Sequence, residues 1–222
     1  AVVFLGEFVS KNPGLSYADQ LMFKKGEIYY SLKQYDKAIF EYKNFTSVYP
    51  TSKLVADAYY WIGKSSENLG QKEEAILNFE KVFKNYKTSE LASASVLEIG
   101  NIYRSQKNFN SAIIIYNSGI SELKKSAKIP EFQYNKGITF LEMSNFQEAY
   151  SVFEEVVTYY PQTIFADKSK IELALIDIAA GRFTTAEQYL NTLAEKRTDE
   201  LGAKSQYYLG QSLYDQGKYN EA

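Results

Sequence analysis

Cysteine and histidine are both absent from this chain of 222 residues. Without cysteine the chain has neither disulfides nor thiolate chemistry. Without histidine it lacks the commonest general base and the commonest metal ligand. Apolar runs such as Ala112 to Tyr116 are far too short to span a bilayer. A formal charge of −2 gives no excess of positive charge, so nucleic acid is not an expected partner.

No cofactor site is indicated by the sequence, because it contains no glycine-rich phosphate loop, calcium loop or metal cluster. Tryptophan and methionine are scarce, with 1 and 2 residues, whereas the chain holds 20 tyrosines and 14 phenylalanines. Tyrosine suits a thin, two-layer structure because its ring can be buried while its hydroxyl reaches water.

Small residues and rings recur along the whole chain with a step of 37 residues, and the last step is 36. Alanine keeps this period at residues 1, 38, 75, 112, 149, 186 and 222. A second register holds Gly26, Gly63, Gly100, Gly137, Ala174 and Gly210, and a third holds Tyr35, Lys72, Phe109, Phe146, Phe183 and Tyr219. Three registers with one period indicate an array of one repeated unit.

Each unit is predicted to be two helices joined by a tight turn. Apolar residues between Ala56 and Leu69 step by three or four, and a second stripe follows from Ala75 to Phe83. The turns are marked by Gly70, Gly181 and Gly217, where a positive φ is often required. The second helices are expected to end at Pro13, Pro50 and Pro161.

Several caps and one close contact are also expected. Serines 16, 52 and 89 are plausible N-caps of the first helices, and Ser144 with Gln147 resembles a capping box. Gly63 opposite Ala75 predicts a close crossing of the two helices of one unit, since neither has a large side chain. The ring register is expected to close the open end of each hairpin.

These residues resemble the tetratricopeptide repeat family, whose pattern places a leading ring, a small residue and a later Ala-x3-aromatic pair at fixed offsets. The chain shows it as Val96-x2-Ile99-Gly100-x2-Tyr103 with Ala112-x3-Tyr116, and again from Tyr59 and from Gly137. The resemblance implies an all-α fold, a right-handed α-solenoid of helix-turn-helix hairpins. The period of 37 exceeds the family's 34, so about three extra residues are placed at the start of each first helix.

The whole chain is interpreted as one array that begins and ends within repeats. Residues 1–18 are assigned to the second helix of a preceding repeat and its linker. The repeats that follow are 19–55, 56–92, 93–129, 130–166 and 167–202, with a partial sixth at 203–222. The stretches Tyr49-Pro50-Thr51-Ser52 and Tyr160-Pro161-Gln162-Thr163 resemble bacterial envelope members of the family. These are the periplasmic protein of the Tol–Pal system and the lipoprotein of the outer-membrane assembly machine, so a periplasmic or envelope-associated location is an expectation.

The family resemblance places ligands in the concave groove lined by the first helices. The groove residues predicted on this basis are Phe23, Tyr30, Tyr60, Trp61, Lys64, Leu97, Asn101, Arg104, Tyr134, Asn135, Ile171, Leu175, Tyr207 and Tyr214. An extended or helical peptide with spaced apolar side chains fits such a surface. The alternative is that these side chains pack laterally between neighbouring first helices and meet no ligand.

Two narrower sites fit the sequence less well than this surface. Asn101, Asn135 and Lys168 match part of a carboxylate-binding clamp of the family, but Glu172 reverses a charge that the clamp needs. Ser121 and Lys124 have the spacing of some acylases without the companion motifs, so a solvated helix face is favoured and no enzyme is expected.

The sequence therefore predicts a non-enzymatic scaffold that binds a protein or peptide in its concave groove, with the bacterial envelope as the expected location. One alternative is a structural module that forms a homo-oligomer through its repeat ends, with no groove ligand. Another is the accessory region of a larger enzyme.

Overall fold

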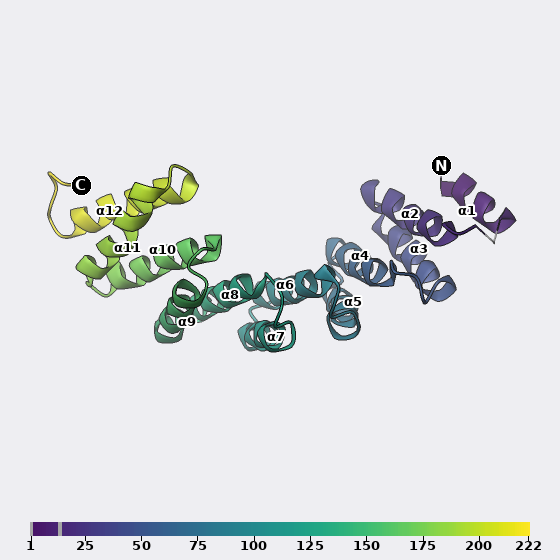
Figure 1. Cartoon of the computed structure of the whole chain (residues 1–222), viewed down its shortest axis with the longest axis horizontal. Coiled ribbons are helices and arrows are strands. Elements are labelled where there is room, and N and C mark those ends of the chain that lie inside the picture. The colour runs from purple at the N-terminus through teal and green to yellow at the C-terminus, as the bar shows by residue number, and fades with distance from the viewer. Residues whose placement is uncertain (1, 13–14) are drawn as a thin grey trace. The chain divides into compact units, whose positions relative to one another are not determined.

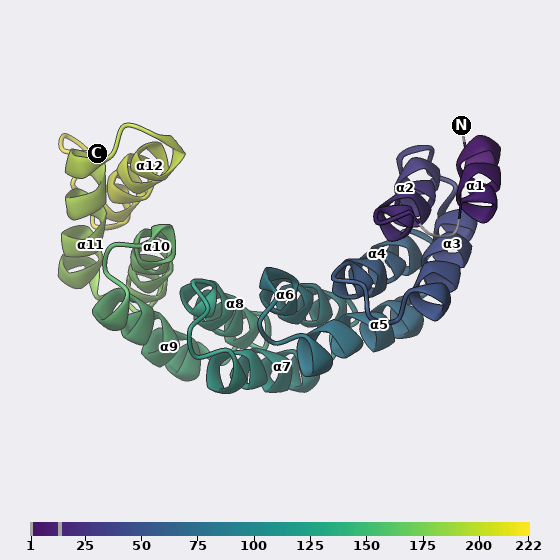
Figure 2. The ribbon, with the colours of Figure 1, turned by 45° about the vertical axis from the view of Figure 1, so that its right-hand side comes forward.

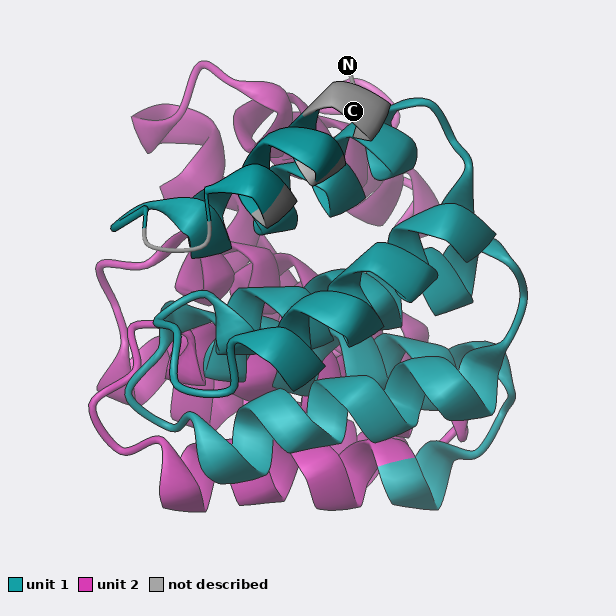
Figure 3. Ribbon diagram, turned by 90° about the vertical axis from the view of Figure 1, so that its right-hand side faces the viewer, with its two compact units in different colours: residues 1–111 teal, residues 112–222 magenta. Residues whose placement is uncertain are grey.

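The computed structural model describes residues 2–12 and 15–222, which form twelve helices and contain no strand. The expectations for Ala1 and Pro13 lie outside the described residues. The chain divides into two compact units, residues 1–111 and residues 112–222, which are coloured separately in Figure 3. Each unit is described by itself below.

Unit 1 consists of helices that follow one another along the chain with short connections (Figure 1). The helices are α1 (Val2–Lys11), α2 (Ala18–Ser31), α3 (Tyr35–Val48), α4 (Val55–Asn68), α5 (Lys72–Asn85) and α6 (Glu90–Ser105). Helix α7 (Phe109–Glu122) starts at the end of this unit, and most of its residues belong to unit 2. Helices α2, α4 and α6 are the first helices of their hairpins.

Unit 2 continues the same alternation. Its further helices are α8 (Ile129–Glu142), α9 (Phe146–Tyr159), α10 (Ile164–Ala179), α11 (Phe183–Lys196) and α12 (Glu200–Asp215). First helices α6, α10 and α12 have 16 residues, whereas α2, α4 and α8 have 14. The extra residues of the period thus lengthen some first helices and lie in the preceding loop of others.

Within each unit, helices that follow one another in the chain pack against each other. In unit 1 this holds from α1 to α6, and α4 also touches α6; in unit 2 it holds from α8 to α12, and α10 also touches α8 and α12 (Figure 2). First helices therefore lie beside first helices, with the second helices along their other side. This is the packing of an α-solenoid, so the predicted fold class is confirmed.

The alanine register forms the centre of each hairpin. Ala38, Ala75, Ala149 and Ala186 are all fully buried. Four residues later on the same helix face comes a large side chain, which is Tyr42, Phe79, Phe153 or Leu190, and each of these is also buried. The core is thus a strip in which small and large residues alternate at a fixed spacing.

The glycine register makes room for these large side chains and not for the alanine. A Cβ atom added to Gly63 would lie 2.6 Å from Phe79, and one added to Gly137 would lie 2.5 Å from Phe153. The expectation that Gly63 is paired with Ala75 is therefore wrong in its partner. The glycine lies under an aromatic ring, and a ring edge cannot move aside as a flexible side chain does.

The six hairpin turns share one left-handed residue at the same register. Gly70, Gly181 and Gly217 have φ of 74°, 72° and 77°, which confirms the predicted turn glycines. The corresponding residues without glycine are Lys33, Lys107 and Ser144, with φ of 58°, 58° and 57°. In the fourth hairpin, Ser144 N donates to Leu141 O at 2.8 Å, which closes the last turn of α8.

Three cap predictions are wrong and one is confirmed. Helix α9 starts at Phe146 with Asn145 as N-cap and no side-chain cap bond, because Ser144 takes the left-handed turn position and cannot cap. The N-caps of α2 and α4 are Tyr17 and Leu54, not the serines. Ser52 instead accepts a hydrogen bond from Leu54 N and donates one to Asp19.

Ser89 is the N-cap of α6, and its side chain accepts a hydrogen bond from Leu91 N. Of the three prolines expected to end second helices, the two within the described residues stand where they were expected. Helix α3 ends at Val48, two residues before Pro50, and α9 ends at Tyr159, two residues before Pro161. Both confirm that proline marks the end of a second helix.

Candidate functional site

A hollow of about 730 Å³ lies between hairpin α8–α9 and the C-terminal half of α10. We call it the α10 notch, and it lies entirely within unit 2. Apolar atoms from α8, α9 and α10 make up most of its wall. It is lined by Leu141, Phe146, Gln147, Tyr150, Glu172, Leu175, Ile176, Ala179, Ala180 and Arg182. Its size matches pockets that hold a small ligand or a side chain with its flanking backbone.

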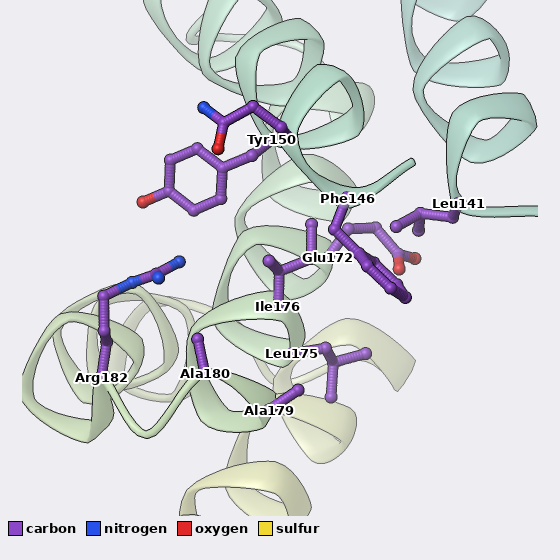
Figure 4. A pocket seen from close by; sticks show the side chains of 10 residues that line it. Leu141, Phe146, Tyr150, Glu172, Leu175, Ile176, Ala179, Ala180 and Arg182 are labelled. Atoms are coloured by element: carbon purple, nitrogen blue, oxygen red, sulfur yellow. The ribbon is translucent and has the colours of Figure 1, made fainter. Parts of the chain in front are cut away.

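One end of the α10 notch is fixed by an ion pair between an exposed arginine and a buried aspartate. Figure 4 shows Tyr150 and Arg182 pointing toward each other. Arg182 forms a salt bridge of 2.6 Å with Asp177, whose side chain is fully buried, and its guanidinium lies 5.5 Å from the Tyr150 ring centre. Burial raises the pKa of Tyr150, and the nearby charge of Asp177 adds to this effect. Because these contacts hold Tyr150 and Arg182 in place, the part of the notch that a ligand can occupy is its apolar wall.

Glu172 is the acidic residue that lines this apolar part. Its carboxylate accepts a hydrogen bond of 3.2 Å from the Tyr134 hydroxyl on α8. Burial raises the pKa of Glu172 above its ordinary value, while the bond from Tyr134 and the charge of Lys204 act in the opposite direction. A half-buried carboxylate with one hydroxyl donor gains free energy from any further donor or cation that reaches it.

The corresponding place in unit 1 is smaller and is bridged by polar side chains. At the corresponding register two repeats earlier, a smaller hollow of about 460 Å³ is lined by Glu73, Ile76, Tyr103, Gln106 and Asn108, and we call it the α6 notch. Polar side chains bridge it, because Gln106 donates to Glu73 at 3.2 Å and the neighbouring Lys72 donates to Ser105 at 3.0 Å. The matching pairs in the α10 notch are Gln147 with Ala180 and Phe146 with Ala179.

Two further hairpins fill the same register in other ways. Next to α4, Tyr30 and Trp61 stand at the registers of Leu141 and Glu172, and their rings lie 4.8 Å apart. Next to α12, Gln216 stands at the register of Ala180 and donates to Glu187 at 2.5 Å. The α10 notch is open because two small alanines stand where other hairpins have longer side chains.

The groove residues predicted in unit 1 are mostly engaged in contacts within the chain. Phe23 is buried in the core, 5.1 Å from the Tyr42 ring, and Trp61 packs on Tyr30. Tyr60 donates to Glu98 at 3.0 Å, and Lys64 forms salt bridges with Glu98 and Glu67. Leu97 and Arg104 are half-buried, while Asn101 is exposed.

The groove residues predicted in unit 2 divide into four groups. Ile171 is buried in a core cluster with Leu193 and Leu201. Leu175 lines the α10 notch, and Tyr134 donates a hydrogen bond to Glu172, which also lines it. Asn135 donates to the Glu131 carbonyl at 2.8 Å. Tyr207 and Tyr214 are exposed and contact the rings of Tyr208 and Tyr219.

Most residues of the α10 notch were missed by sequence reasoning. Phe146 had been assigned to closing its hairpin, whereas it is more than half exposed and forms part of the wall. The signal that could have found the site is the departure from the repeat and not the repeat itself. The helix C-cap register contains Leu32, Leu69, Gln106, Met143, Ala180 and Gln216, and only one of these is small.

The described residues hold no group of three or more acidic side chains placed to bind a metal ion. In the same part of the chain, no helix has both the length and the apolar composition needed to cross a bilayer.

Two tetratricopeptide repeat family models match the chain. One matches residues 20–52, 57–89 and 131–163, and the other matches residues 171–222. Together they account for more than half of the chain. A search of curated protein sequences finds no significant match.

Solved structures with the same fold are similar over most of the chain. A tetratricopeptide repeat protein from Parabacteroides merdae is 14% identical with a TM-score of 0.63, over 90% of this chain and 74% of that one. The pilF protein of Pseudomonas aeruginosa is 16% identical with a TM-score of 0.64, over 91% and 86%. The apo form of RapI is 15% identical with a TM-score of 0.73, over 96% and 64%.

Identities this low establish the fold alone. The family models, the recurring alanine and glycine registers and the packing of hairpins within each unit nevertheless agree in every repeat that they cover. The chain belongs to the tetratricopeptide repeat family.

Proposed function

We propose that this chain is a non-enzymatic scaffold that binds a peptide or protein segment, and that the α10 notch holds an apolar side chain of that segment. The observation that supports the proposal is the open apolar hollow in unit 2, at a register that other hairpins fill. Burying an apolar side chain the size of leucine in the notch stabilises the bound state by about 2 kcal/mol, because its apolar surface leaves water. A scaffold of this fold generally acts by such contacts with proteins.

Residues at the same register of other hairpins provide both a variant and a control to test this site. The change Ala180→Gln introduces the residue that Gln106 and Gln216 have at the same register, so the fold tolerates it while the side chain enters the notch. The control is Gln106→Ala, which removes the bridge to Glu73 and leaves the α10 notch unchanged.

A phage-displayed random-peptide library selected on the unaltered chain provides the probe. Peptides that it yields are expected to bind Ala180→Gln at least about tenfold more weakly, a loss of about 1.4 kcal/mol, and to bind Gln106→Ala with the original affinity. Calorimetry measures both constants, and circular dichroism checks that the variants stay helical. Selected peptides that bind Ala180→Gln as well as the unaltered chain would contradict the proposed site.

Self-association is the alternative that this experiment separates. A homo-oligomer formed through the repeat ends would show light scattering that rises with protein concentration and is indifferent to Ala180→Gln. An envelope-associated location is supported by the two Tyr-Pro stretches alone, and fractionation of cells that hold the full-length protein tests it.

A further inference from the structure

Glu98 and Glu172 stand at the same register of their helices, and each accepts a hydrogen bond from a tyrosine on the preceding first helix. Tyr60 donates to Glu98 at 3.0 Å, and Tyr134 donates to Glu172 at 3.2 Å. In both pairs the donor precedes the acceptor by 38 residues. The same tyrosine-to-glutamate hydrogen bond between neighbouring first helices therefore holds both glutamates.

A lysine contacts Glu98, whereas the matching register next to Glu172 holds an apolar residue. Lys64 lies one helical turn after Tyr60, and its ammonium is 3.1 Å from Glu98 and 2.7 Å from Glu67. Burial acts to lower the pKa of Lys64, but its bonds to the two glutamates outweigh this and raise it. Two repeats later the register of Lys64 is occupied by Ile138, and the register of Glu67 by Leu141.

Glu172 thus faces the α10 notch without a bonded cation of its own. Lys204 forms its salt bridge with Glu200 at 3.4 Å and acts on Glu172 through its charge. Lys168, one helical turn before Glu172, has its ammonium over the rings of Phe165 and Tyr134, at 5.3 and 5.9 Å from their centres. Arg182, at the other end of the notch, is held by Asp177. In Figure 4, Glu172 lies toward the end of the notch where Leu141 and Phe146 are found.

On the basis of the proposed function, we propose that the segment bound in the α10 notch carries a basic side chain close to its apolar anchor, and that this cation pairs with Glu172. The ligand then completes in unit 2 the contact that Lys64 makes within the chain in unit 1. Charge complementarity of this kind selects between partners more strongly than it adds affinity.

The probes are short peptides, acetylated at one end and amidated at the other, with one leucine and one lysine separated by one to three glycines. Each has a twin in which glutamine replaces the lysine and another in which glycine replaces the leucine. We expect at least one lysine peptide to bind the unaltered chain about tenfold more tightly than its glutamine twin. Added salt should reduce this ratio, since the contact is between charges.

Two variants locate the cation. Glu172→Gln keeps the acceptor for Tyr134 and removes the charge, and Ile138→Lys introduces the lysine of the unit 1 arrangement. With either variant, the lysine peptide and its glutamine twin are expected to bind with about the same affinity. Circular dichroism checks the folding of Ile138→Lys, and Glu172→Gln decides the question should that variant unfold.

The outcomes separate this inference from the proposed function. Equal affinities of the lysine and glutamine twins, or a lysine preference that survives Glu172→Gln, would overturn the inference. If the leucine peptides still bind more tightly than their glycine twins, the apolar site stands without the cation. If the glycine twins bind as well as the leucine peptides, both proposals are contradicted.

Discussion

At the scale of single residues, the glycine register shows why one position in each first helix is so constrained. Gly137 lies against the ring of the fully buried Phe153, whereas the fifth hairpin has Ala174 at this register and Leu190 in place of the ring. The added methyl group is thus matched by the loss of an aromatic ring. The two positions vary as a pair because they share one volume.

We expect Gly137→Ala to lower the free energy of unfolding by about 1–2 kcal/mol, because overpacking outweighs the gain in helix propensity. The double variant Gly137→Ala with Phe153→Leu reproduces the fifth hairpin and should be more stable than the sum of the single changes predicts. Urea denaturation measures all three. The control is Gly210→Ala, whose nearest neighbour is 3.4 Å away, and which should not destabilise. Strict additivity of the two changes would show that the ring and the glycine are not coupled.

Glu172 gives a second test at the residue scale, through its titration. Burial raises the pKa of its carboxyl group, and the hydrogen bond from Tyr134 partly offsets this by stabilising the charged form. Tyr134→Phe removes the donor, so the pKa should rise further, and carbon-13 NMR of the labelled carboxyl measures it. Since the folded state holds the proton more tightly than the unfolded chain, its contribution to stability is present at low pH and is lost as pH rises through the folded pKa. A pKa that falls in Tyr134→Phe would show that the hydroxyl does not act as a donor.

At the scale of the hairpin, the turns differ in how well their residue suits a left-handed backbone. Three turns have glycine there, and three have Lys33, Lys107 and Ser144 at positive φ. A side chain in this conformation costs about 1 kcal/mol relative to glycine. The backbone geometry is nearly the same in all six turns, so the strain belongs to the residue and not to the turn.

Ser144→Gly is therefore expected to raise the free energy of unfolding by about 0.5–1 kcal/mol. The opposite change, Gly181→Ala, should lower the free energy of unfolding by a similar amount, because Gly181 has φ of 72°. A Cβ atom added there meets no neighbour within 4 Å, so the backbone conformation alone accounts for the loss. Thermal denaturation followed by circular dichroism compares the two variants. A gain in stability from Gly181→Ala would contradict the explanation.

At the scale of the whole molecule, the sequence predicts what repeats and fails to predict what departs from the repeat. The period located the buried alanines, the turn glycines and the ends of the second helices, since these are required in every hairpin. Glycine was expected to let backbones touch, but its partner ring depends on side-chain packing that spacing alone does not reveal. The Ser144 cap was missed because the turn geometry outweighs the local capping pattern.

The candidate site illustrates the same limit. A search for rows of apolar residues selected Phe23 and Ile171, which the structure buries in the core. The α10 notch arises where one hairpin has alanines and its neighbours have longer side chains, a difference that a periodic pattern averages away. Only Leu175 of the predicted groove residues lines this notch.

The tyrosine-to-glutamate bonds that join neighbouring first helices have a consequence for how such a chain can grow. Tyr60 with Glu98 and Tyr134 with Glu172 are both separated by 38 residues, one period plus one. The two bonds lie two repeats apart. Duplicating a complete pair of hairpins therefore keeps each hydroxyl opposite a carboxylate, whereas an insertion of a few residues within a helix rotates one partner away. These bonds therefore favour growth by whole pairs of hairpins, within which one register can hold either an internal cation, Lys64, or an apolar side chain, Ile138.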